Sequence, residues 1–183
     1  MEFEVIRSGR RTLAAEIKNG RLLIRTPQQI ADAEIDAFVR QHRHWIETHL
    51  AKAEAQRREL ERLEPLPEEE LRQLAEQAQR SIPKRVAFYA AQIGVSYGKI
   101  TIRRQKTRWG SCSAGGNLSF NCLLMLAPPE VLDSVVVHEL CHRKQMNHSE
   151  RFYAEVLRHF PEYWKWNRWL KENGPQLMAR AGR

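Results

Sequence analysis

The chain has 183 residues, a formal net charge of +8 and a hydrophobic fraction of 42%, which is ordinary for a globular protein. It has no apolar run near the ~20 residues that span a bilayer and no signal-like N-terminus, so we expect no membrane association. Its few cysteines lack paired spacing, which argues against a disulfide framework and indicates the reducing cytoplasm. They are Cys112, Cys122 and Cys141.

The N-terminal third predicts a small antiparallel sheet, a β-meander over residues 2–26, and then a long helix over residues 31–63. Apolar and polar residues alternate in the first segment as in half-buried strands. Asn19-Gly20 lies between two apolar runs, where it favours a hairpin turn. The helix that follows carries apolar residues at helical spacing.

A proline-rich break separates this part from a second helix. Pro65 and Pro67 end the first helix, and the acidic residues after Pro67 favour a new helical start over residues 68–93. We expect Pro83 to kink or split this helix and Gly94 to end it.

The rest of the chain predicts strands within residues 99–126 and then helices. Pro129 opens a helix that reaches His142. Asn147 is expected to cap the next helix, with Glu150 as its capping-box partner.

A last helix is expected between Pro161 and Gly174, with a loose tail from Pro175. Its aromatic residues are expected to dock on the core, and stacking on nucleobases is the alternative. They are Tyr163, Trp164, Trp166 and Trp169.

These elements predict an α+β fold: a twisted antiparallel sheet packed on one helix, preceded by the meander and completed by a helical C-terminal half. We expect one domain over residues 1–183. Residues 1–64 form its N-terminal part and residues 68–175 its catalytic part.

Residues 138–142 read His-Glu-Leu-Cys-His. Two histidines four residues apart lie on one face of a helix, so His138 and His142 can reach one ion. Glu139 stands where it can take a proton from a water on that ion. The apolar residues before the motif predict a buried helix, and buried histidines need partners. The motif therefore predicts a metal site with Glu139 as the catalytic base.

His148 is the expected third ligand, because the chain between it and His142 is long enough to reverse. Glu155 is the rival, either as a ligand or as a residue that orients one. Three protein ligands leave one position on zinc open, as a catalytic site requires. We expect one zinc ion per chain, although other divalent transition metals accept imidazoles.

Four further residues are candidates for the surroundings of the metal or for substrate binding. Arg108 could hold an anionic substrate or carry charge on an exposed strand. Trp109 could line a pocket, but packing on the sheet is favoured. Ser111 and Asn121 complete this set.

The chain resembles the YgjP-like metallopeptidase-domain family, a group of predicted metal-dependent hydrolases related to the SprT and WLM groups of zincin-like proteases. The resemblance is densest over residues 108–152, from Arg-Trp-Gly-Ser-Cys through His-Glu-Leu-Cys-His to Asn-His-Ser. It implies a zincin-like α+β fold, metal binding by His138, His142 and His148, and a base at Glu139. Where the family often has tryptophan, this chain has Cys122.

The first functional hypothesis is a zinc peptidase in which the strand 118–126 pairs with an extended peptide. A metal-dependent nucleotide pyrophosphatase is the alternative, because residues 99–108 hold five basic residues and no acidic one. A nucleic-acid-associated SprT-like protease, or a basic binding protein, is a third hypothesis that rests on the net charge. The expected partner is thus a peptide or a nucleotide, with nucleic acid as a further candidate. The sequence predicts no oligomeric state.

Overall fold

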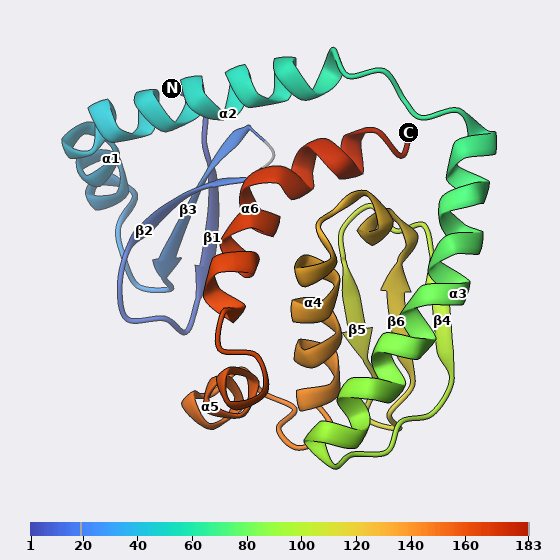
Figure 1. Cartoon of the computed structure of the whole chain (residues 1–183). Coiled ribbons are helices and arrows are strands. Elements are labelled where there is room, and N and C mark those ends of the chain that lie inside the picture. The colour runs from blue at the N-terminus through green and yellow to red at the C-terminus, as the bar shows by residue number, and fades with distance from the viewer. Residues whose placement is uncertain (19, 183) are drawn as a thin grey trace. The chain divides into compact units, whose positions relative to one another are not determined.

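The computed structural model describes residues 1–18 and 20–182 and forms two compact units, Met1–Arg62 and Leu63–Arg183. The described residues contain two three-stranded sheets and six α-helices, so the predicted α+β class is confirmed (Figure 1). No helix in these residues is long and apolar enough to cross a bilayer. Whether the two units act as one domain stays a prediction.

The first unit contains a sheet in the order β1-β3-β2 and two helices. The prediction of a meander is wrong, because β3 lies in the centre, antiparallel to β2 but parallel to β1. β3 is the most buried of the three strands, which explains its central place. The predicted turn falls on Asn19, which lies outside the described residues. The elements are β1 (Glu4–Ser8), β2 (Ala14–Lys18), β3 (Arg21–Pro27), α1 (Asp32–Gln41) and α2 (Arg43–Glu61).

The single long helix expected over residues 31–63 is also corrected, because it breaks at His42. The backbone of His42 has φ −100° and ψ 14°, outside the helical range. The break allows Ile35 and Val39 of α1 and Ile46 of α2 to pack in one cluster on the sheet.

The second unit combines a sheet in the order β4-β6-β5 with four α-helices and a 3-10 helix. The predicted antiparallel sheet is wrong in part: β6 is antiparallel to β5 but parallel to β4. The buried strand β6 takes the centre, so the consecutive strands β4 and β5 flank it instead of pairing. The elements are α3 (Glu68–Ile93), β4 (Ile100–Arg103), β5 (Gly110–Cys112), β6 (Leu118–Asn121), η1 (Cys122–Leu126), α4 (Pro129–Cys141), α5 (Glu150–His159) and α6 (Tyr163–Ala179).

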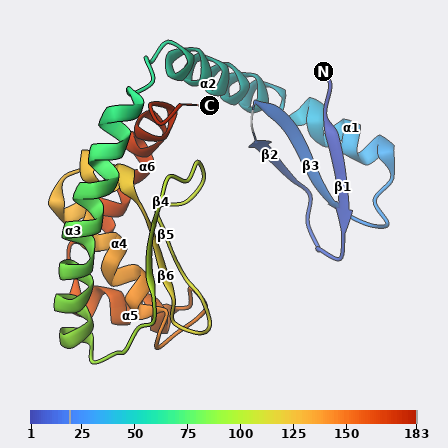
Figure 2. The ribbon, with the colours of Figure 1, turned by 90° about the vertical axis from the view of Figure 1, so that its right-hand side faces the viewer.

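Helices α3 and α4 pack against one face of this sheet (Figure 2). Pro83 does not split α3, because a buried stripe along the whole helix holds it on the core across the missing hydrogen bond. Gly94 ends α3 as predicted, with a left-handed φ of 74°. Arg85 of α3 forms a two-bond ion pair with the buried Asp133 of α4, at 2.5 and 2.6 Å.

The C-terminal segment is ordered, in contrast to the loose tail that was predicted. Helix α6 continues through Pro175 to Ala179. The carbonyl of Arg180 then accepts a hydrogen bond from the N–H of Leu66 at 2.7 Å, and Ala181 is buried. We infer that this packing against the start of the second unit offsets the unfavourable free energy of Pro175 inside the helix.

Candidate metal centre and catalytic cleft

Helix α4 positions the first two histidines. It begins at Pro129, as predicted, and is buried on almost every side. His138 lies on its last full turn, and His142 caps its C-terminal end. Their rings lie 4.9 Å apart between centroids, which places both imidazoles on one side of the helix.

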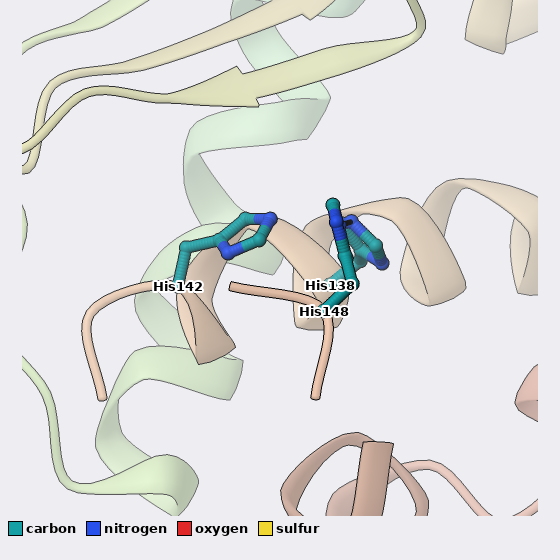
Figure 3. Close-up of side chains that lie close together, drawn as sticks. All are labelled: His138, His142 and His148. Atoms are coloured by element: carbon teal, nitrogen blue, oxygen red, sulfur yellow. Dashed lines mark hydrogen bonds between the residues drawn. The ribbon is translucent and has the colours of Figure 1, made fainter. Parts of the chain in front are cut away.

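A turn after α4 brings the third histidine back over the first two (Figure 3). The Nε2 atoms of His148 and His138 lie 3.0 Å apart, and one ring nitrogen from each histidine falls in a group within 4.8 Å. The ring of Phe152 lies 4.6 to 4.9 Å from all three imidazoles and supports them.

The cap that fixes this turn differs from the predicted one. Ser149, and not Asn147, caps α5, because its side chain accepts a hydrogen bond from the N–H of Phe152. His148 is therefore the residue directly before the cap, and the start of α5 fixes its position.

Burial favours the neutral form of the two histidines of the helix, His138 and His142. It lowers the pKa of His138 to about 3, assisted by the positive charge that His142 and His148 would carry, and it also lowers the pKa of His142. The Nδ1 atom of His138 lies 2.9 Å from the hydroxyl of Tyr163, and that of His142 lies 3.1 Å from the carbonyl of Gln145. The Nε2 atoms of both rings are thus left for another partner.

This donor set fits zinc. Nitrogens about 2.0–2.1 Å from a tetrahedral zinc ion lie roughly 3.3 Å from one another. The separation of 3.0 Å between His138 Nε2 and His148 Nε2 is close to that value, and all three ligand nitrogens lie within 4.8 Å of one another. Neutral imidazoles can bind a cation without first losing a proton.

Glu139 lies beside this group on the same helix and is only 6% exposed. Burial raises the pKa of its carboxyl to about 8, and the nearby charge of Arg108 acts in the opposite direction. The side chain packs directly against Gly110: a β-carbon at that position would come within 2.6 Å of Oε1. A side chain at position 110 would therefore displace the carboxylate.

Two hollows meet at Glu139: a cleft that contains the three histidines, and a pocket that extends toward α6. The two hollows share four lining residues, which are Arg108, Gly110, His138 and Glu139. The cleft also contains the other two histidines together with Ser111, Cys112 and Met146. The pocket extends past Trp109 to the face of α6 formed by Tyr163, Asn167 and Leu170.

Strand β5 forms the rim of the cleft and is an edge strand of its sheet. Hydrogen-bonded and non-hydrogen-bonded residue pairs alternate along two antiparallel strands. Backbone hydrogen bonds of 2.9 Å join Trp109 to Asn121 and Ser113 to Asn117. Ser111 lies midway between Trp109 and Ser113 and faces Ser119, so this pair is also a hydrogen-bonded one. The N–H and C=O groups of Gly110 and Cys112 therefore point to the open edge.

Two of the predicted residues, Asn121 and Glu155, line neither the cleft nor the pocket. Asn121 is buried; its side chain donates to the carbonyls of Gln105 and Arg108 and accepts from the N–H of Leu123, so it holds the loop before β5. Glu155 is paired with Lys144 and with His159, 3.1 Å away, and stands apart from the three-histidine group.

No role for Gly110, Tyr163 or Asn167 was predicted from the sequence. Gly110 was named only within the Arg-Trp-Gly-Ser-Cys run, and Tyr163 only as one of the aromatic residues of the last helix, expected to dock on the core. The spacing of Tyr163 and Asn167, four residues apart on one helical face, was the signal that could have linked them.

Comparison with known proteins identifies the class. The family described as YgjP-like, metallopeptidase domain, matches residues 11–72 and 64–173. The chain therefore belongs to this family, as the sequence resemblance implied.

Two solved structures are similar to part of the chain. One is the metallopeptidase zymogen jannalysin of Methanocaldococcus jannaschii, with 22% identity and a TM-score of 0.46 over 51% of this chain and 96% of that one. The other is the metallopeptidase zymogen abylysin of Pyrococcus abyssi, with 22% identity and a TM-score of 0.45 over 50% of this chain and 93% of that one. No curated protein matches the chain.

Proposed function

We propose that this protein is a zincin-like, zinc-dependent peptidase, with His138, His142 and His148 as ligands and Glu139 as general base. The observation that carries the proposal is the convergence of three imidazole nitrogens within 4.8 Å beside a buried carboxyl. When bound, zinc supplies a Lewis acid that polarises a carbonyl and lowers the pKa of water to about 7.

Glu139 supplies the proton transfer. An adjacent cation lowers the pKa of a carboxyl, so metal loading favours the ionised form that the base needs. The ionised carboxylate accepts a proton from the attacking water and returns it to the leaving amine. Gly110 packs closely against this side chain, which lines the cleft beside the three histidines.

The substrate strand is proposed to lie along β5. The earlier expectation that strand 118–126 pairs with a peptide is wrong, because β6 is already paired on both sides and residues 122–126 are helical. The outward N–H and C=O groups of Gly110 and Cys112 instead offer an open edge. The pocket beyond Glu139 would then receive one substrate side chain.

The test is hydrolysis of unfolded protein and of a peptide library by the zinc-loaded full chain, with Glu139→Gln as the matched control. Cleavage by the wild type that is lost in the variant, at equal zinc content, supports the proposal. A zinc-loaded wild type that cleaves neither substrate contradicts it.

A nucleotide pyrophosphatase remains the second candidate, and the place of Arg108 favours it. Arg108 lines the cleft together with the three histidines, and a guanidinium group is suited to hold a phosphate. Its neighbour Arg104 is instead paired with Glu68 at 2.8 Å, so the basic run does not gather as a whole at the cleft. Release of pyrophosphate from a nucleoside triphosphate, lost in Glu139→Gln, would favour this reaction over peptide cleavage. Nucleic-acid binding stays a prediction from net charge.

A further inference from the structure

Helix α6 contacts the metal centre through the ring of its first residue. Tyr163 is buried, its ring lies 5.9 Å from that of His138 and nearly parallel to it, and its hydroxyl lies 2.9 Å from His138 Nδ1. His138 is the only one of the three histidines whose described Nδ1 contact is made by a side chain; that of His142 is made by a backbone carbonyl.

The hydroxyl is itself held by the next turn of α6. Asn167 Nδ2 donates to Tyr163 Oη at 3.1 Å, from a position four residues along the same helical face. The oxygen has two lone pairs, so it can accept from Asn167 and from His138 Nδ1 at the same time. The series of contacts from Asn167 through Tyr163 to His138 thus links α6 to a histidine that lines the cleft.

When His138 Nε2 binds a metal, the neutral ring carries its proton on Nδ1 and must donate it. The ring of His138 is half-buried and its Nδ1 faces the buried side chain of Tyr163, so loss of this acceptor would leave the N–H with no protein partner that replaces it. The oxygen of Tyr163 lies where this acceptor is required.

We propose that Tyr163 is a positioning residue for the metal centre: its hydroxyl accepts the Nδ1–H of His138 and fixes that ring for metal binding, while Asn167 holds the hydroxyl in place. The inference rests on the metal site of the proposed function, but it does not depend on which bond the enzyme hydrolyses.

Zinc affinity of the full-length chain, measured by competition with a chromophoric chelator, tests the role without any substrate. Loss of a side-chain partner of a ligating histidine typically weakens metal binding 10- to 100-fold, and we expect a loss in this range for Tyr163→Phe. Asn167→Ala should cause a smaller loss, roughly threefold, because the hydroxyl remains but is less restrained.

Tyr153→Phe is the matched control. Tyr153 belongs to the same aromatic cluster, with its ring 6.1 Å from that of His148 and 6.2 Å from that of Tyr163, but His138 Nδ1 is paired with Tyr163. Its variant removes one hydroxyl from the cluster and should bind zinc as tightly as the wild type.

A proton NMR spectrum of the zinc form separates positioning from a general loss of packing. The hydrogen-bonded and shielded Nδ1–H of His138 should give a slowly exchanging downfield signal in the wild type and in Tyr153→Phe. That signal should be lost in Tyr163→Phe at an unchanged melting temperature of the metal-free protein. Equal zinc affinity and an unchanged signal in Tyr163→Phe would overturn the inference while the proposed function stands. A wild type that binds no zinc would overturn both.

Discussion

The α-carbon of Gly110 lies against the carboxylate of Glu139, so closely that a β-carbon at position 110 would stand 2.6 Å from Oε1 and 2.8 Å from Cγ. Contacts below 3.0 Å are not tolerated, so either the strand or the acid must move. This contact joins the edge strand β5 to the proposed base on α4.

Gly110→Ala should therefore reduce turnover by about 100-fold, as expected for a displacement of a catalytic group by about 1 Å. Zinc content should remain near that of the wild type, because the three atoms nearest to the new methyl group all belong to Glu139 and none to a histidine. Gly115→Ala is the control in the same segment, where the nearest atom to a new β-carbon is 3.9 Å away. Full activity in Gly110→Ala would show that Glu139 does not need its present position.

Glu139→Gln keeps the shape of the side chain and removes its basicity. We expect a loss of 10²- to 10⁴-fold in kcat, the usual contribution of a general base, with zinc still bound. Steady-state kinetics on whichever substrate the wild type cleaves measures this loss. Retained turnover would assign proton transfer to another group.

The raised pKa of Glu139 also predicts a pH-dependent stability of the metal-free protein. The folded-state pKa of about 8 lies above the ordinary 4.5, so the stabilising contribution of the protonated carboxyl is complete below pH 4.5 and is lost as the pH rises through 8. Glutamine does not titrate. The free energy of unfolding of Glu139→Gln relative to wild type should thus increase by roughly 3 kcal/mol between pH 5 and pH 8.

Urea unfolding of both metal-free proteins at the two pH values measures this difference. The comparison cancels the opposite contribution of His138, whose lowered pKa reduces stability as the pH falls below 6.5. A difference between the two proteins that is the same at pH 5 and pH 8 would contradict the described environment of Glu139.

Ser149→Ala removes the cap of α5 and should lower the free energy of unfolding by about 1 kcal/mol. Zinc affinity should fall as well, because the capping hydrogen bond fixes Ser149, the residue directly after the proposed ligand His148. Asn147→Ala, at the exposed position that the sequence favoured as the cap, should change neither quantity appreciably. A larger loss of stability on thermal unfolding in Asn147→Ala than in Ser149→Ala would instead support Asn147 as the cap.

The core of the proposed site was predictable because it is local in sequence. The pair His138 and His142 depends only on helical spacing, and the proline start of α4 with its run of valines predicts a buried helix. The third histidine follows within one turn and one loop. Within one helix, the spacing of two residues alone determines whether their side chains lie on the same face.

The strand order was not predictable in this way. Alternating residues predict that β1, β2 and β3 exist, but the central place of β3 follows from the burial of Leu22 and Ile24 in one cluster with residues of α1 and α2. The same holds for β6, whose central place leaves β5 as the open rim of the cleft. The contact between Tyr163 and His138 joins residues 25 positions apart and depends on how α6 packs against α4.

The three-histidine centre is tested by the metal content of the purified wild type and of His148→Ala, prepared side by side without chelators, with a change at the exposed His44, His44→Ala, as a control. We expect about one zinc ion per chain in the wild type and in His44→Ala, and its loss in His148→Ala. A wild type that holds no metal even after zinc is supplied would contradict the three-histidine centre on which the proposed function rests.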